Sequence, residues 1–245
     1  CINLSGKNLG VADVTLLTAW IQRPEVIASL TSLRCGSNPI KDEGMAVLLD
    51  AVKGIGLIEF DIANTEIGPP TAKKLAEVLS DPTPFTGSIA SLKLDSNGIF
   101  GELYPSGNVK EADKFVTEVQ PLLDALKTSS ITSLSLRGTG MGVKGVAAVA
   151  DAMSTMGSVN SLTLDSTGVM KDQYGRTGQG TQKTYTLTTG EDTIDLSSKN
   201  LGCADINLLA VWIRRPEVIA SVTTLVLDEC ELSGTKIKYK GSPCE

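Results

Sequence analysis

Two segments of the chain, 192 residues apart, have nearly the same sequence. Residues 2–33 read INLSGKNLGVADVTLLTAWIQRPEVIASLTSL, and residues 194–225 read IDLSSKNLGCADINLLAVWIRRPEVIASVTTL. Of the 32 aligned positions, 22 are identical. Self-similarity at a fixed interval is typical of proteins in which related units stack on one another. The chain is therefore expected to be built from such units.

A shorter repeat lies inside this long one. The spacing L-x-x-L-x-L-x-x-N-x-L, with related apolar residues allowed, recurs at intervals of 27 to 42 residues. Alternating apolar residues such as Leu92 and Leu94 predict a short strand with one buried face. An asparagine at the following turn, such as Asn38 or Asn97, can hydrogen-bond backbone groups of the neighbouring unit. Helical patterns follow at 42–52, 70–79, 112–126 and 143–153, and around Trp20 and Trp212, which predicts parallel strands joined by helices.

The stretches NPIKDEGMAVLLDAV and TGMGVKGVAAVADAM resemble repeats of ribonuclease-inhibitor-like leucine-rich repeat proteins. This family includes the Ran GTPase-activating protein and the receptors with nucleotide-binding and leucine-rich repeat regions. The resemblance implies an α/β leucine-rich repeat solenoid, or horseshoe, with parallel β-strands on the concave face and α-helices on the convex face. It predicts one domain over residues 1–245 with about eight repeats. It does not specify function, because its members bind unrelated partners.

Two stretches interrupt the repeat, near residues 100–110 and 171–190. Insertions in solenoids usually form surface loops, some of which bind partners. A β-hairpin at 182–188 is one structure that the second stretch could form. The chain begins within an expected strand and ends just after one, with no polar cap. Two explanations follow: the chain is part of a longer array of 192-residue blocks, which we favour, or its ends are covered by partners.

The composition argues against two classes of partner. The formal net charge is −6 and the pI is about 4.9, whereas a phosphate-binding surface needs a basic stripe. The one dense basic cluster is Lys236, Lys238 and Lys240, so nucleic acid is not an expected partner. No apolar run reaches the length of about eighteen residues that a membrane span requires.

The five cysteines, Cys1, Cys35, Cys203, Cys230 and Cys244, include no C-x-x-C pair. Their odd number and scatter argue against a disulfide framework. Cys35 takes the place of a repeat leucine and is expected to be buried and reduced, and Cys230 takes an asparagine-type position. The compartment is left open, with an intracellular one favoured.

Catalytic and cofactor sites are not expected. The chain has no histidine, which removes the Ser-His-Asp and Cys-His arrangements and the usual histidine-containing metal sites. The glycines Gly140, Gly142 and Gly145 match G-x-G-x-x-G, a pattern that lets a dinucleotide approach a helix N-terminus. They are better explained as the point where this repeat turns from strand into helix. We expect no cofactor and no metal.

Side chains between the buried leucines of each strand are expected to point to the concave face. This stripe is polar and mildly acidic, and the aromatic side chains lie in the inserted loops instead. Because tight interfaces are rich in Trp, Tyr and Arg, the stripe could equally be a solvated face without a tight ligand. The candidate partner-contacting residues are Arg34, Glu59, Asp61, Lys93, Asp95, Arg137, Asp165, Asp195 and Asp228 on the stripe, and Phe100, Tyr104, Tyr174 and Tyr185 in the loops.

Three functions are consistent with these features. The first is a non-enzymatic scaffold that binds a protein partner through the concave face and the inserted loops. The second is a structural subunit that stacks on copies of itself head to tail, because nearly the same segment lies near both ends. The third, regulation of a GTPase, rests on the resemblance to one family member alone.

Overall fold

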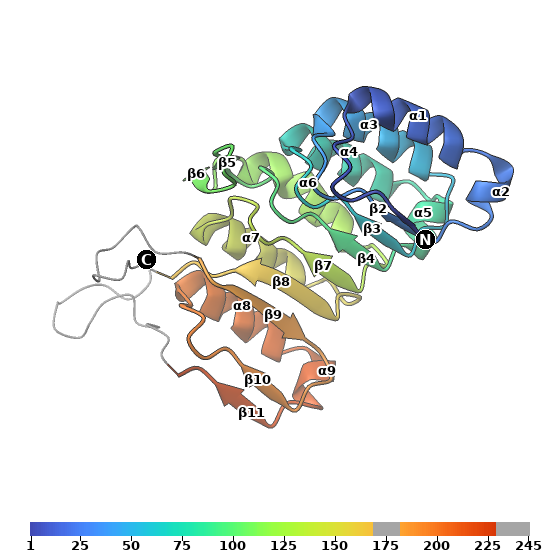
Figure 1. The fold of residues 1–245 in the computed structure, drawn as a ribbon. Coiled ribbons are helices and arrows are strands. Elements are labelled where there is room, and N and C mark those ends of the chain that lie inside the picture. The colour runs from blue at the N-terminus through green and yellow to red at the C-terminus, as the bar shows by residue number, and fades with distance from the viewer. Residues whose placement is uncertain (169–181, 229–245) are drawn as a thin grey trace.

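The computed structural model describes residues 1–168 and 182–228 (Figure 1). Its centre is a seven-stranded sheet in which each strand lies next to the one that precedes it in the chain. The sheet order is β1-β2-β3-β4-β7-β8-β9, and all neighbours are parallel except β8 and β9. The strands are β1 (Ile2–Asn3), β2 (Ser32–Arg34), β3 (Glu59–Asp61), β4 (Ser91–Lys93), β7 (Ser133–Ser135), β8 (Ser161–Asp165) and β9 (Thr184–Thr188).

The register of the sheet lines up one buried apolar side chain from each strand. Partners across the sheet are the apolar residues at the centre of the repeat pattern, and the polar residues on either side of them point to the opposite face. Burial of this continuous row against the helices stabilises a unit that could not bury its apolar face alone. The row is Ile2, Leu33, Phe60, Leu92, Leu134, Leu162 and Leu187.

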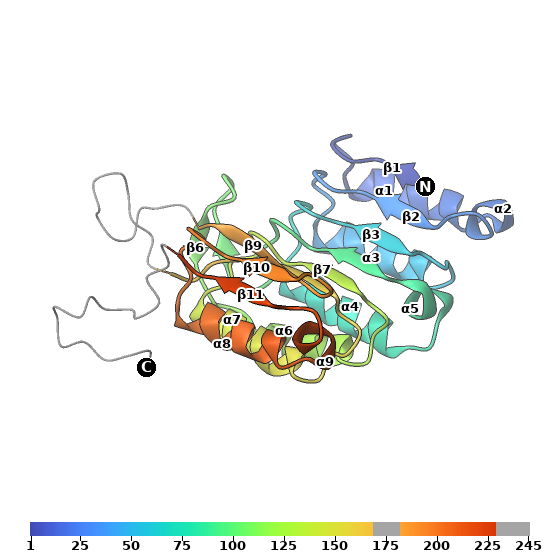
Figure 2. The ribbon, with the colours of Figure 1, turned by 90° about the horizontal axis from the view of Figure 1, so that it is seen from below.

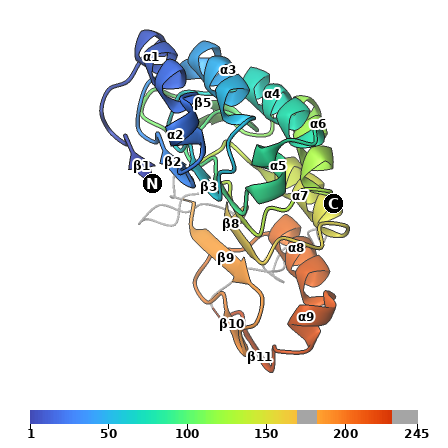
Figure 3. The same ribbon diagram turned by 90° about the vertical axis from the view of Figure 1, so that its right-hand side faces the viewer.

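The long helices form one layer on one face of the strands, each packed against the next (Figures 2 and 3). The helix predicted at 143–153 is confirmed with the same bounds, the helix predicted at 42–52 begins one residue earlier, and the helix predicted at 70–79 is longer by one residue at each end. The helix predicted from residue 112 begins at Val116 instead, because residues 112–115 form turns between the strand at Val109–Glu111 and the helix. The long helices are α1 (Val11–Ile21), α3 (Lys41–Val52), α4 (Pro69–Ser80), α6 (Val116–Leu126), α7 (Val143–Met153) and α8 (Cys203–Ile213). Short helices α2 (Pro24–Ile27), α5 (Pro84–Ser88) and α9 (Pro216–Ile219) follow α1, α4 and α8.

The prediction of a horseshoe-shaped leucine-rich repeat solenoid with parallel strands along its whole concave face is wrong. The alternating sequence TYTLT supplies β9, which pairs antiparallel with the open edge of β8. Strands β10 (Thr193–Asp195) and β11 (Thr224–Val226) then form a separate two-stranded parallel sheet. The structure is a mixed α/β fold with an open, mostly parallel central sheet, the class to which Rossmann-type folds also belong.

Both interruptions of the repeat contain strands. In the first, β5 (Glu102–Leu103) and β6 (Val109–Glu111) form an antiparallel hairpin. In the second, the hairpin predicted at 182–188 is wrong in detail, since these residues supply the single strand β9 and the partner strand is β8. The rest of the second stretch, 171–181, lies outside the described residues.

Asparagines at the turns connect neighbouring units, as their position in the repeat predicts. The side-chain amide of Asn38 accepts hydrogen bonds from the Lys7 and Leu9 amides at 2.9 and 3.0 Å and donates to the Leu4 carbonyl at 2.9 Å. Asn97 makes the corresponding bonds to the backbone of the preceding unit, including one from the amide of Thr65 at 2.9 Å. Each amide therefore satisfies buried backbone groups that no ladder bond reaches.

The glycine-rich turn before α7 is packed with protein. Gly140 has a φ of +75°, and a Cβ there would lie 2.7 Å from the Cα of Gly101 in the segment that leads to β5. We expect Gly140→Ala to lower the free energy of unfolding by about 2–4 kcal/mol, through backbone strain and overlap with Gly101. Urea unfolding measures this, with Gly54→Ala as the control because an added Cβ there meets no atom within 4 Å. Equal effects of the two substitutions would contradict the packing described.

Cys1 and Cys35 are free, whereas Cys203 forms a disulfide bond. Cys230 and Cys244 lie outside the described residues. Cys35 is fully buried, as its place in the repeat predicts.

The two free thiols are expected to react very differently. Burial, together with the charge of Asp61, raises the pKa of the Cys35 thiol to about 12, so this thiol is protonated as well as inaccessible near neutral pH. Cys1, in contrast, is exposed. Iodoacetamide at about pH 8 should therefore alkylate Cys1 and leave Cys35 unmodified until the protein is unfolded. Peptide mass spectrometry reads both sites, and equal rates at the two cysteines would show that Cys35 is not buried in solution.

Candidate functional site

The predicted partner-contacting stripe lies on the face of the sheet that the helices leave uncovered, and its charges are largely paired within the chain. The guanidinium of Arg34 donates two hydrogen bonds to the carboxylate of Glu59, at 3.0 and 2.9 Å. The ammonium of Lys93 lies 3.7 Å from Glu59 and 3.9 Å from Asp61. Hydrogen bonding from Arg34 holds the pKa of the Glu59 carboxyl below its usual value. The charged side chains of β2, β3 and β4 on this face therefore largely neutralise one another.

The remaining carboxylates of the stripe bind neighbouring strands and turns. Asp95 accepts hydrogen bonds from the hydroxyl of Ser135 at 2.6 Å and the amide of Arg137 at 2.9 Å. Asp165 accepts from the amide of Gly138 at 2.6 Å and a hydroxyl in β9. The amide of Ser197 donates to Asp195 at 2.9 Å, whereas the side chains of Arg137 and Asp228 are exposed. The structure therefore gives most of the predicted acidic residues a local structural role.

Two of the four predicted aromatic contacts are not on the surface. Phe100 is fully buried beneath the β5–β6 hairpin, and Tyr185 is buried with its hydroxyl on Asp205. This corrects the expectation that both contact a partner, because an insertion needs apolar anchors in the core. Tyr104 is 52 % exposed at the hairpin. Tyr174 lies outside the described residues.

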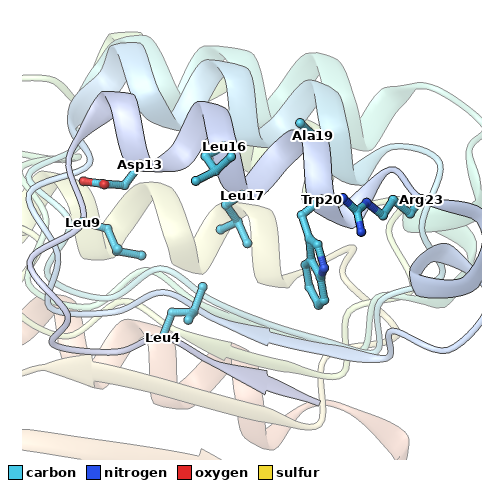
Figure 4. A pocket seen from close by; sticks show the side chains of 8 residues that line it. All are labelled: Leu4, Leu9, Asp13, Leu16, Leu17, Ala19, Trp20 and Arg23. Atoms are coloured by element: carbon cyan, nitrogen blue, oxygen red, sulfur yellow. The ribbon is translucent and has the colours of Figure 1, made fainter.

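An exposed apolar surface lies elsewhere, at the end of the stack formed by β1 and α1 (Figure 4). Here Leu16 is 75 % and Trp20 is 41 % exposed. The indole of Trp20 hangs from α1 toward the strand beside a hollow of about 470 Å³. We call this surface the N-terminal end face, and its main residues are Leu4, Leu9, Leu16, Leu17, Trp20 and Arg23.

The duplicated segment shows what the same surface looks like when it is covered. Residues 194–225 fold as residues 2–33 do: β10 pairs with β11 in the register in which β1 pairs with β2, and α8 and α9 match α1 and α2. Of the eight residues that line the hollow, seven are identical in the second copy, and Ala19 is replaced by Val211. Yet Leu208 and Trp212, the counterparts of Leu16 and Trp20, are 0 % exposed.

In the second copy the cover is formed by α7, β8 and β9 with the segments that flank them. Helix α7 packs against α8, and the guanidinium of Arg215 donates to the carbonyls of Val159 and Gly157. The same guanidinium lies 4.6 Å from the centroid of the Trp212 ring. The counterpart of Arg215 in the first copy, Arg23, is exposed.

A buried carboxylate completes this covered interface. Asp205 accepts hydrogen bonds from the amide and the hydroxyl of Thr167, at 2.8 and 2.6 Å, and from the hydroxyl of Tyr185 at 2.9 Å. It also accepts from the amide of Gly202 at the start of its own helix. Burial and the charge of Asp205 raise the pKa of the Tyr185 hydroxyl, which therefore remains a donor. Asp13, the counterpart of Asp205, bonds the amide of Gly10 at 3.0 Å and is exposed.

The sequence analysis did not predict this surface, because a tryptophan that recurs at one position of two similar helices is usually a packing residue. For Trp212 that interpretation agrees with the structure, whereas Trp20 is half-exposed. The duplication itself was the available signal. Two copies of one segment at different places in a stack do not have the same neighbours.

The glycine motif before α7 contains no free anion site. The carboxylate of Asp113 accepts hydrogen bonds from the amides of Gly142, Lys144 and Gly145, at 2.7, 2.8 and 2.8 Å. These are the helix N-terminal amides that a phosphate would need, and they already bind an anionic group. The glycines leave room for Asp113, since a Cβ on Gly142 would lie 2.7 Å from its oxygen.

The fold and the end face together define a mixed α/β protein with an open, mostly parallel central sheet and an exposed apolar end face. A scan against family models finds no match, and a search of curated proteins also finds none. Within residues 1–168 and 182–228, no helix has the length and apolarity that a membrane span requires. In the same residues, no group of three or more His, Cys, Asp or Glu side chains is arranged to hold a metal ion.

Proposed function

We propose that this protein is a non-enzymatic protein-binding module and that the N-terminal end face is its principal contact surface. One observation carries the proposal: seven of the eight residues lining the exposed hollow recur in the second copy, where they are buried against other segments of the same chain. A hollow of this size could also hold a small molecule. The second copy favours protein, because there the same side chains are covered by a helix and two strands of the chain.

The proposal moves the contact surface away from the face predicted from the sequence. The sheet face remains exposed, but most of its carboxylates and cations are paired within the chain. Side chains that are already paired with each other have little charge left to attract a partner, and exposed ion pairs are weak interactions in any case. The N-terminal end face instead places Trp20 and Arg23 on an exposed apolar surface, and Trp and Arg are two of the residue types enriched in binding hot spots.

The native mass of the protein tests this proposal. The tagged chain, expressed in cells of its source and released by gentle lysis, is sized by gel filtration with light scattering. We expect a particle larger than the chain mass of 25.7 kDa, and we expect Leu16→Lys to return the protein to the mass of the chain alone. Val47→Lys is the matched control, because Val47 is an exposed apolar residue of helix α3 away from the end face.

A substitution on the sheet face separates the two surfaces. Arg137→Ala removes an exposed cation of that face and should leave the particle intact. The proposal is wrong if the wild-type protein elutes at its own chain mass, or if Leu16→Lys elutes with the wild type. If Arg137→Ala alone releases the protein, the sheet face is the contact surface instead.

A further inference from the structure

The identity of the partner can be read from the second copy of the duplicated segment. Its end face is covered by α7, β8 and β9. The chain itself therefore shows what kind of unit packs against this face. We propose that the N-terminal end face is the docking site for a protein unit of the kind formed by α7, β8 and β9, which covers the equivalent face of the second copy. This inference rests on the proposed function and specifies its partner.

Shape and apolarity are the first argument. The exposed leucines and Trp20 occupy the positions of Leu208, Leu209 and Trp212, which are buried against the unit that ends in β9. Both segments have the same secondary structure and the same strand register. A surface that fits the second copy should therefore fit the first.

Polar complementarity is the second argument, and it gives the docking specificity. The end face carries two charged groups, Asp13 and Arg23. Their counterparts in the second copy are Asp205, which accepts hydrogen bonds from Thr167 and Tyr185, and Arg215, which donates to two carbonyls. An unrelated apolar surface would bury both charges without partners, at considerable cost. A unit like the one formed by α7, β8 and β9 supplies two hydroxyl groups for the carboxylate and two carbonyl groups for the guanidinium.

An extended chain tests the proposal. Residues 1–192 are placed ahead of residue 1, so that the new junction matches the natural one between residues 192 and 193. Trp20→Phe in the added block and Trp212→Phe in the original one leave the inner Trp20 as the single tryptophan. We expect its emission to shift to shorter wavelength, and its quenching by acrylamide to fall several-fold, relative to Trp20 alone in the unextended chain.

Arg23→Ala provides the matched control. In the extended chain it should increase the quenching of the inner Trp20, whereas in the unextended chain, where Arg23 is exposed, it should have little effect. Circular dichroism checks the fold, and an extension by residues 112–192 gives the same readout if the longer chain does not fold.

Two results would overturn the assignment. In the first, the inner Trp20 of a folded extended chain is quenched as strongly as in the unextended one. In the second, light scattering shows that the unextended chain oligomerises with concentration and that Trp20 becomes protected as it does so. The occupant would then be the opposite end of a second molecule. Neither readout depends on the native mass in an extract, so the proposed function and this inference can fail separately.

Discussion

Replacement of Trp212 by alanine is expected to lower the free energy of unfolding by about 3–5 kcal/mol, because a large core side chain is removed and a cavity remains. The ring is fully buried and the guanidinium of Arg215 stacks on it. Trp20→Ala is the matched control at the equivalent position of the same helical segment. It should cost about 1 kcal/mol, because a half-exposed side chain loses less burial.

Urea unfolding of the two alanine variants and the wild type measures this difference. Trp212→Phe should cost much less than the alanine change, since the indole N–H of Trp212 is buried and has no hydrogen-bond partner among the described residues. Similar losses for Trp20→Ala and Trp212→Ala would mean that the two copies have similar surroundings.

Asp205→Ala is expected to have an effect of comparable size, about 3–5 kcal/mol, because it leaves buried donors without an acceptor. The donors are the amides of Thr167 and Gly202 and the hydroxyls of Thr167 and Tyr185. Asp13→Ala removes the bond to the exposed amide of Gly10 and should cost less than about 1 kcal/mol.

Tyr185→Phe separates the contributions within this network. It removes one donor from Asp205 while the two bonds from Thr167 remain, so we expect a loss of about 1–2 kcal/mol. The account fails if Asp13→Ala destabilises the protein as much as Asp205→Ala. That result would place Asp13 in a buried network of its own.

Much of the local structure could be predicted from the sequence. Apolar alternation located the strands of the central sheet, and the helical spacing located α3, α4 and α7 within a residue or two. The asparagine positions predicted bonds between units, which Asn38 and Asn97 make. These features depend on nearest neighbours in the sequence, so the pattern of a single unit contains them.

The overall architecture and the candidate site depend on contacts that no single unit specifies. The alternating sequence TYTLT predicts a strand but not whether it pairs parallel or antiparallel. Its antiparallel pairing depends on the edge of β8 that is available to it. The sequence places Phe100 and Tyr185 in inserted loops, but both side chains are buried in the core. Identical residues at Trp20 and Trp212 have opposite exposure for the same reason, because the covering unit lies elsewhere in the chain.

The most direct test of the central claim compares the two tryptophans in the unextended protein. Trp212→Phe leaves Trp20 alone, and Trp20→Phe leaves Trp212 alone, so acrylamide quenching reports each end of the stack separately. The account predicts that Trp20 is quenched several-fold more strongly and emits at longer wavelength than Trp212, as their exposures of 41 % and 0 % require. Equal, strong protection of both rings in a monomer would contradict it, because the N-terminal end face would then already be covered.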